Sequence, residues 1–199
     1  MTQTAKTAKL PRIAAAQDGL ATIEFAIVAP VFCLLLMGIF DIGQMAYARA
    51  ILSGAVEKAA RSSAMESANT TTADQMVKDA IKPILPGATF ASTRVGYVDF
   101  SDVQRAEKFT DTNSNGTCDP GEPYVDENRS GHWENDVGVS GNGGANDVVL
   151  YTVTVTYKPV FRVNILGNTT QTRTMTAIGV RKNQPFATQQ GYGSSAGTC

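Results

Sequence analysis

A long apolar run near the N-terminus constrains the fold of this chain more than any other feature. Residues 25–40 carry no charge, and with residues 20–24 and 41–48 they reach the ~20 residues that a bilayer-spanning helix needs. Glu24 is the single charged residue between positions 20 and 40. A carboxylate in such a helix costs roughly 2.5–3.5 kcal/mol at mid-bilayer, so Glu24 indicates a partner. We predict a membrane span at about residues 20–48, kinked at Pro30.

Cleavage of the chain after Gly19 would supply that partner. The new amine at Leu20 would lie four residues before Glu24, on the same face of the helix. The preceding residues, 1–19, form a short basic leader whose removal would change the formal net charge from −1 to −3. The alternative is a removable secretory signal, but the apolar run continues as an amphipathic segment and is not followed by an Ala-x-Ala-type site in the way such signals need. The mildly acidic mature chain also lacks the basic surface that a nucleic-acid partner requires.

The second half of this helix is amphipathic rather than uniformly apolar. Its apolar residues recur at i, i+3 and i+4 spacing and form one stripe: Ile51, Leu52, Ala55, Val56, Ala59 and Ala60. Charged residues lie on the other side at Glu57, Lys58 and Arg61. The pattern predicts one continuous helix over residues 20–67, whose second half packs against a head domain.

The remaining residues, 68–199, predict a modest extracytoplasmic head. A short helix is expected at 73–84, strands at 93–100, 148–157 and 170–180, and a turn at 164–168. The segment 148–157 alternates most clearly, and we expect its Thr and Tyr side chains on one face and its Val side chains on the other. The predicted fold class is α+β, with the long helix packed on a small antiparallel sheet.

An acidic insertion at residues 110–147 interrupts this head. Residues 111–122 match the twelve-residue calcium-loop template, which has oxygen ligands at positions 1, 3, 5, 7, 9 and 12 and glycine at position 6. The predicted ligands are Asp111, Asn113, Asn115, the carbonyl of Thr117, Asp119 and Glu122. These oxygen ligands favour one bound calcium ion. The alternative is a solvated acidic loop that binds nothing.

A second run repeats only the first part of the template. Asp126, Asn128, Ser130 and Gly131 have the spacing of positions 1, 3, 5 and 6, but Val137 stands at position 12. This run is therefore expected either to share ligands with the first loop or to bind no ion.

The cysteine and histidine residues do not form a recognisable catalytic motif. Cys118 and Cys199 can pair in an oxidising compartment, or remain two free thiols, and the spacing does not decide between these states. Cys33 fits a small apolar residue of the helix. His132 is the only histidine, and it has no nucleophile near it in a known spacing. We predict that the chain is not an enzyme.

The N-terminal motifs resemble those of a known family. A glycine at position 19, a glutamate five residues later and the run at 24–30 are similar to prepilin processing sites. With residues 47–50 (Tyr-Ala-Arg-Ala) and 59–61 (Ala-Ala-Arg), they resemble the TadE-like pseudopilins of tight-adherence (Tad) pilus systems. The strong resemblance covers about residues 18–62, whereas residues 100–147 depart from simpler family members.

This resemblance implies a structural, pilin-like protein. A prepilin peptidase would cut after Gly19, and Glu24 would pair with the Leu20 amine during assembly. The chain would cross the bacterial inner membrane once, with a periplasmic head, and would contact other pilus or pseudopilin subunits as a minor component of an adhesion pilus. The alternative function is a single-pass, calcium-dependent binding protein that is neither processed nor incorporated in a filament.

Overall fold

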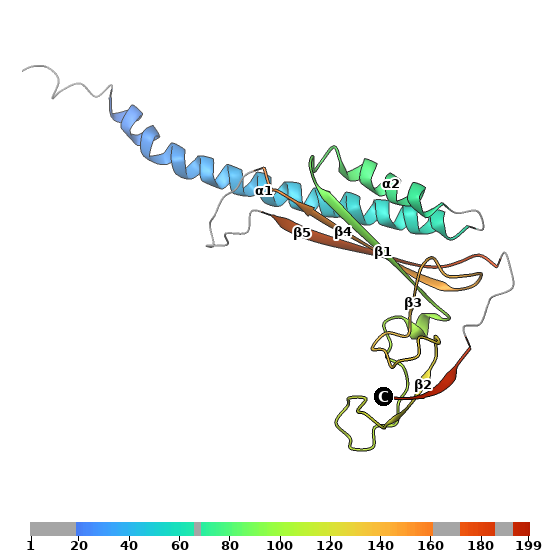
Figure 1. Cartoon of the computed structure of the whole chain (residues 1–199). Helices are drawn as coiled ribbons and strands as arrows, with labels where there is room; N and C mark the ends of the chain where they lie inside the picture. The colour runs from blue at the N-terminus through green and yellow to red at the C-terminus, as the bar shows by residue number, and fades with distance from the viewer. Residues whose placement is uncertain (1–18, 66–68, 161–171, 186–192) are drawn as a thin grey trace, which may run out of the picture.

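The structure is a computed structural model that describes residues 19–65, 69–160, 172–185 and 193–199. Its elements are α1 (Leu20–Ser63), α2 (Thr70–Ile81), β1 (Thr89–Tyr97), the 3-10 turn η2 (Phe100–Asp102), β2 (Pro123–Asp126), β3 (Val139–Ser140), β4 (Val148–Tyr157), β5 (Arg173–Lys182) and β6 (Ser195–Thr198). A long helix and a small antiparallel sheet confirm the predicted α+β class (Figure 1). Residues 1–18 of the expected leader and the expected turn at 164–168 lie outside the described residues.

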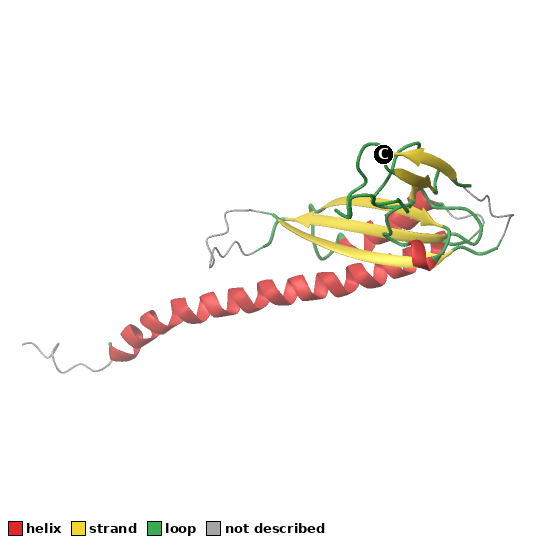
Figure 2. Ribbon diagram, turned by 90° about the horizontal axis from the view of Figure 1, so that it is seen from below, coloured by secondary structure: helices red, strands yellow, loops and turns green. Residues whose placement is uncertain are grey.

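Helix α1 runs without interruption through Pro30. It ends at Ser63, whose hydroxyl donates hydrogen bonds to the carbonyls of Ala59 and Ala60 at 3.0 and 3.1 Å. A side-chain hydrogen bond of this kind competes with the backbone hydrogen bonds of the last turn and so favours the end of the helix there. The N-terminal half of α1 extends far beyond the sheet, while its second half lies along it (Figure 2).

The main sheet has the strand order β3-β1-β4-β5, and all neighbours are antiparallel. Strand β4 has the bounds that its alternation predicted, Val148–Tyr157. It pairs along its length with β5, from Val148 opposite Lys182 to Tyr157 opposite Arg173. Strand β1 begins four residues earlier than expected, because Thr89 already pairs with Thr156.

The hydrophobic core lies between the sheet and both helices. Apart from Ala48, its buried α1 residues belong to the predicted stripe, and Leu52 and Val56 are fully buried there. Tyr151 and Tyr157 of β4 share this buried face with Val153 and Val155. The prediction that tyrosines would lie with threonines was therefore wrong, because residues 151 and 157 have the parity of Val153 and Val155.

Helix α2 also begins earlier than the predicted residue 73. The side chain of Asn69 accepts hydrogen bonds from the backbone N–H groups of Thr71 and Thr72 at 2.9 and 3.1 Å. This N-cap satisfies two donors of the first turn, so the helix starts at Thr70. It ends at Ile81, and Pro83, which has no backbone N–H, cannot continue the hydrogen-bond ladder of the helix.

The segment between β1 and β4 leaves one end of the main sheet (Figure 1). A small apolar cluster anchors it, in which Val103 and Val137 pack against Tyr97, Val148 and Leu150. Strand β2 of this segment pairs with the C-terminal strand β6 as a separate two-stranded sheet. The insertion thus has its own small framework beside the helix-covered core.

Candidate functional site: the apolar helix and the acidic loops

The N-terminal half of α1 exposes a continuous apolar surface. Ala21–Ser63 is long and apolar enough to cross a membrane, with a mean hydropathy of 2.5 in its most apolar window, none of which is buried. Exposed large side chains include Phe25, Ile27, Phe32, Leu35, Ile39 and Phe40. Glu24 lies on this exposed helix and, within the described residues, makes no ion pair. The helix is therefore a candidate membrane anchor.

An ion pair marks the point where the head begins to cover α1. Asp41 is 8 % exposed and lies 2.7 Å from the guanidinium of Arg173 at the start of β5. The hydrogen bond to Asp41 raises the pKa of Arg173, so this arginine stays charged. Residues 20–40, before this contact, would extend about 31 Å at ~1.5 Å per residue, close to the ~30 Å of a bilayer's hydrocarbon core.

The first acidic loop, residues 111–122, forms one closed turn. Asp111 accepts a 2.8 Å hydrogen bond from the N–H of Gly116, which has the positive φ of +77° that position 6 requires. Glu122, 6 % exposed, accepts the N–H groups of Thr112 and Asp119 at 2.8 and 3.0 Å. The six predicted ligand residues therefore belong to one compact loop.

Amide groups complete the contacts within this loop. The Asn115 side chain accepts the N–H of Thr117 at 2.8 Å, and the side-chain amides of Asn113 and Asn115 each donate to Asp119 at 2.7 Å. In the described part of the chain, no three His, Cys, Asp or Glu side chains are grouped closely enough to hold a metal by themselves. Any ion held here would depend on amide and carbonyl oxygens as well, as calcium loops do.

A disulfide connects the first loop to the C-terminus. The structure joins Cys118 to Cys199, whose Cα atoms lie 5.8 Å apart. Two backbone hydrogen bonds reinforce it, from Gly121 to Cys199 at 3.1 Å and from Cys199 to Glu122 at 3.0 Å. Strand β6 is therefore held along its length by pairing with β2 and just after its C-terminal end by this loop. Cys33 is a free thiol on the exposed part of α1.

The second acidic loop, residues 126–134, adopts the same local turn. Asp126 is 3 % exposed and accepts the N–H groups of Ser130 and Gly131 at 3.0 and 2.9 Å. Burial alone would raise the pKa of Asp126, but these hydrogen bonds outweigh it and lower the pKa below its usual value. Val137 at position 12 packs in the apolar cluster beside Tyr97 and supplies no ligand.

Glu107 is the residue at these loops that sequence reasoning missed. It is 2 % exposed, and its carboxylate accepts the N–H groups of Glu127 and Glu134 at 2.7 and 3.1 Å. The indole of Trp133 donates to the Glu107 carbonyl at 3.0 Å. Glu107 precedes the predicted insertion at residues 110–147. Its partners Glu127 and Glu134 follow it by twenty or more positions, so no short sequence motif contains all three residues.

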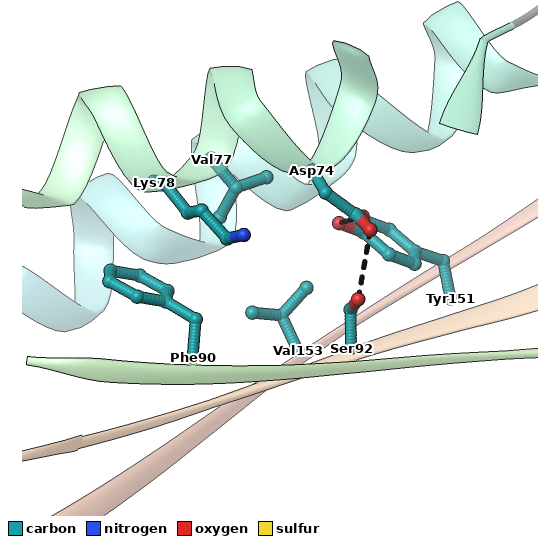
Figure 3. A pocket seen from close by; sticks show the side chains of 7 residues that line it. All are labelled: Asp74, Val77, Lys78, Phe90, Ser92, Tyr151 and Val153. Atoms are coloured by element: carbon teal, nitrogen blue, oxygen red, sulfur yellow. Dashed lines mark hydrogen bonds between the residues drawn. The ribbon is translucent and has the colours of Figure 1, made fainter. Parts of the chain in front are cut away.

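A shallow pocket elsewhere is a structural contact between α2 and the sheet (Figure 3). Asp74 accepts hydrogen bonds there from Ser92, Arg94 and Tyr151. Burial alone would raise the pKa of Asp74, but the bonds from Arg94 and Tyr151 lower it overall. Burial and the same carboxylate raise the pKa of Tyr151. These polar groups satisfy one another and hold α2 against the sheet.

Comparison with known proteins identifies the N-terminal part of the chain. Residues 19–61 match the family model of the TadE-like proteins. No curated protein and no solved structure matches the chain. The matched range covers the apolar half of α1, Glu24, and the stripe that packs on the sheet. As the motif around Gly19 and Glu24 predicted, the N-terminal helix is similar to the TadE-like family over residues 19–61.

Proposed function

We propose that the chain is a minor pseudopilin of a Tad-type adhesion pilus, with a structural rather than a catalytic role. The observation that carries this proposal is the TadE-like helix, which exposes apolar side chains over residues 21–40 and then becomes part of the head's core. Helix α1 would first hold the subunit in the bacterial inner membrane, with the head in the periplasm. The same apolar surface would then pack against other pilus subunits.

Glu24 would set the register of that packing. A prepilin peptidase that cuts after Gly19 would create an amine at Leu20, one helical turn before the carboxylate. In an apolar helix bundle an unpaired carboxylate is strongly unfavourable, so Glu24 would favour arrangements that bring it to its own or a neighbour's amine.

Replacing Glu24 tests this role. In Glu24→Ala we expect cleavage after Gly19 to continue and incorporation into pili to fall, because the helix loses its register charge. The measurement is the amount of the chain in sheared pili relative to the membrane. Ile23→Ala is the matched control, since Ile23 is a neighbouring exposed apolar residue and carries no charge. Normal incorporation of Glu24→Ala would contradict the proposal.

We further propose that residues 111–122 bind one calcium ion. The ligands would be Asp111, Asn113, Asn115, Thr117, Asp119 and Glu122, and the support is the match to the calcium-loop spacing together with the closed turn. The ion would stiffen the loop that the disulfide connects to β6.

Removal of calcium tests this site in the full-length chain in detergent. The full chain is needed because α1 supplies part of the head's core. A chelator should lower the melting temperature of the wild-type protein, since an ion that binds only the folded state stabilises it. Glu122→Gln should melt at the lower temperature with or without chelator. An unchanged wild-type transition would count against a bound ion at this loop.

A further inference from the structure

The two acidic loops share a set of contacts that goes beyond their sequence spacing. In each loop the aspartate at position 1 accepts the N–H groups of positions 5 and 6, at 3.1 and 2.8 Å for Asp111 and at 3.0 and 2.9 Å for Asp126. Position 4 has a positive φ in both, +60° at Ser114 and +62° at Arg129. In each loop the asparagine at position 3 donates to the acidic side chain at position 9. Residues 126–134 therefore fold as the corresponding part of the first loop does.

Glu107 takes the place that Glu122 occupies in the first loop. There, the position-12 carboxylate of Glu122 accepts the N–H groups of positions 2 and 9. In the second loop, positions 2 and 9 are Glu127 and Glu134, and both donate to the carboxylate of Glu107. Each carboxylate uses one oxygen for position 2 and the other for position 9. A glutamate that precedes the loop in sequence thus stands where the template requires the last ligand.

The burial of two carboxylates without a cationic side chain beside them is a second, independent observation. Glu107 and Asp126 are 2 % and 3 % exposed. Within residues 19–65, 69–160, 172–185 and 193–199, neither carboxylate lies in an ion pair with a lysine, arginine or histidine. The nearby Arg105 is engaged by Asp102 and Glu127 instead. Buried carboxylates are normally paired with a cation or coordinate a metal, and among the described residues no cationic side chain fills that role for Glu107 and Asp126.

We propose that Glu107 completes a second calcium site with the loop at residues 126–134. The other oxygen ligands would be the side chains of Asp126, Asn128, Ser130 and Glu134 and the carbonyl of His132. Their oxygen-only chemistry and the carboxylate at the last position suit calcium. This second site goes beyond the proposed function, since it depends neither on the first loop nor on incorporation in a pilus.

The ion would close a contact between distant parts of the insertion. Glu107 lies before the first loop, whereas Asp126 ends β2, the strand that pairs with the C-terminal β6. Calcium held between them would fix the chain on both sides of the first loop. Trp133, the chain's single tryptophan, lies in this second loop with its ring against Phe109 at 5.5 Å between centroids.

The number of bound ions tests the proposal directly. Native mass spectrometry of the full-length chain in detergent, prepared with calcium, should find two ions on the wild type and one on Glu107→Gln. Glu122→Gln should also retain one ion, which it holds at the second site. Glu127→Gln is the matched control, because it makes the same chemical change at a carboxylate that faces Arg105, and it should retain two ions.

Terbium luminescence sensitised by Trp133 identifies which site is filled. Glu107→Gln should abolish the signal, and Glu122→Gln should keep it. If the Glu107→Gln variant loses its near-ultraviolet circular dichroism signal, it has lost its tertiary structure, and the Glu134→Gln variant is tested in its place. That change is at a partly exposed side chain and should raise the calcium dissociation constant of the second ion alone, on the order of tenfold, because one ligand charge is removed.

Three results would overturn the second site. The first is a folded Glu107→Gln chain that still binds two ions. The second is a wild-type chain that binds one ion, lost only in Glu122→Gln, which would leave the first loop's site intact. The third is a wild-type chain that binds no calcium, which would overturn both sites while leaving the pilus role untouched.

Discussion

Replacing Leu52 by alanine tests whether α1 is part of the head or only its anchor. Leu52 lies on the second half of α1, is 0 % exposed and belongs to the core shared with α2, β4 and β5. Leu→Ala at a fully buried site costs about 2.7–5.0 kcal/mol, the sum of lost apolar burial and the cavity left behind. A loss of about 3 kcal/mol lowers the melting temperature by roughly 6–12 °C in a domain of this size, at ~2–4 °C per kcal/mol.

The assay is thermal unfolding of the full-length chain in detergent, followed by near-ultraviolet circular dichroism. This signal arises mainly from tyrosine and tryptophan side chains, and the head contains Tyr97, Tyr124, Tyr151, Tyr157 and Trp133. Leu35→Ala is the matched control, since it makes the same change on the same helix at a side chain that is 62 % exposed. We expect its melting temperature to stay near the wild-type value. A Leu52→Ala head as stable as the control would refute a core shared with α1.

Two further predictions concern polar contacts that hold the head together. Asp74→Asn should lose about 1.5–3 kcal/mol at neutral pH, because Arg94 and Tyr151 lose a charged acceptor. The pKa of Asp74 is lowered in the folded chain from its usual 3.8, so its stabilisation is present above that pH and fades as pH falls through the lower folded value. Denaturant unfolding at two pH values should therefore show the gap between wild type and variant closing in acid. Arg173→Met should leave Asp41 unpaired at the helix–sheet contact and raise proteolysis of the head in detergent, whereas Arg61→Met, on an exposed position of α1, should not.

The helix and the strongest strand could be predicted because their signals are local. An apolar run followed by a 3.6-residue stripe predicted α1, and strict alternation predicted the bounds of β4. The start of α2 was predicted too late because the Asn69 N-cap, and not the first apolar residue of the stripe, determines where the helix begins.

The two candidate sites also differ in whether their residues are close together in the sequence. The first acidic loop is contiguous, so the sequence alone shows its spacing, and calcium binding at its six residues stays a prediction. Glu107 was not predictable, because the fold brings it to residues 126–134 from before the first loop. Position 12 of the second loop is Val137, which has no side-chain oxygen. Only the three-dimensional contacts show that Glu107 makes the hydrogen bonds that the position-12 glutamate makes in the first loop.

The N-terminal peptide of the chain in sheared pili tests the central claim most directly. Mass spectrometry of the pilus and membrane fractions gives both the location and the first residue in one measurement. We predict a peptide beginning at Leu20 in the pilus fraction, as processing after Gly19 and incorporation require. A chain found only in the membrane fraction, beginning at Met1 or Thr2, would contradict the pseudopilin role and favour an unprocessed membrane-anchored binding protein.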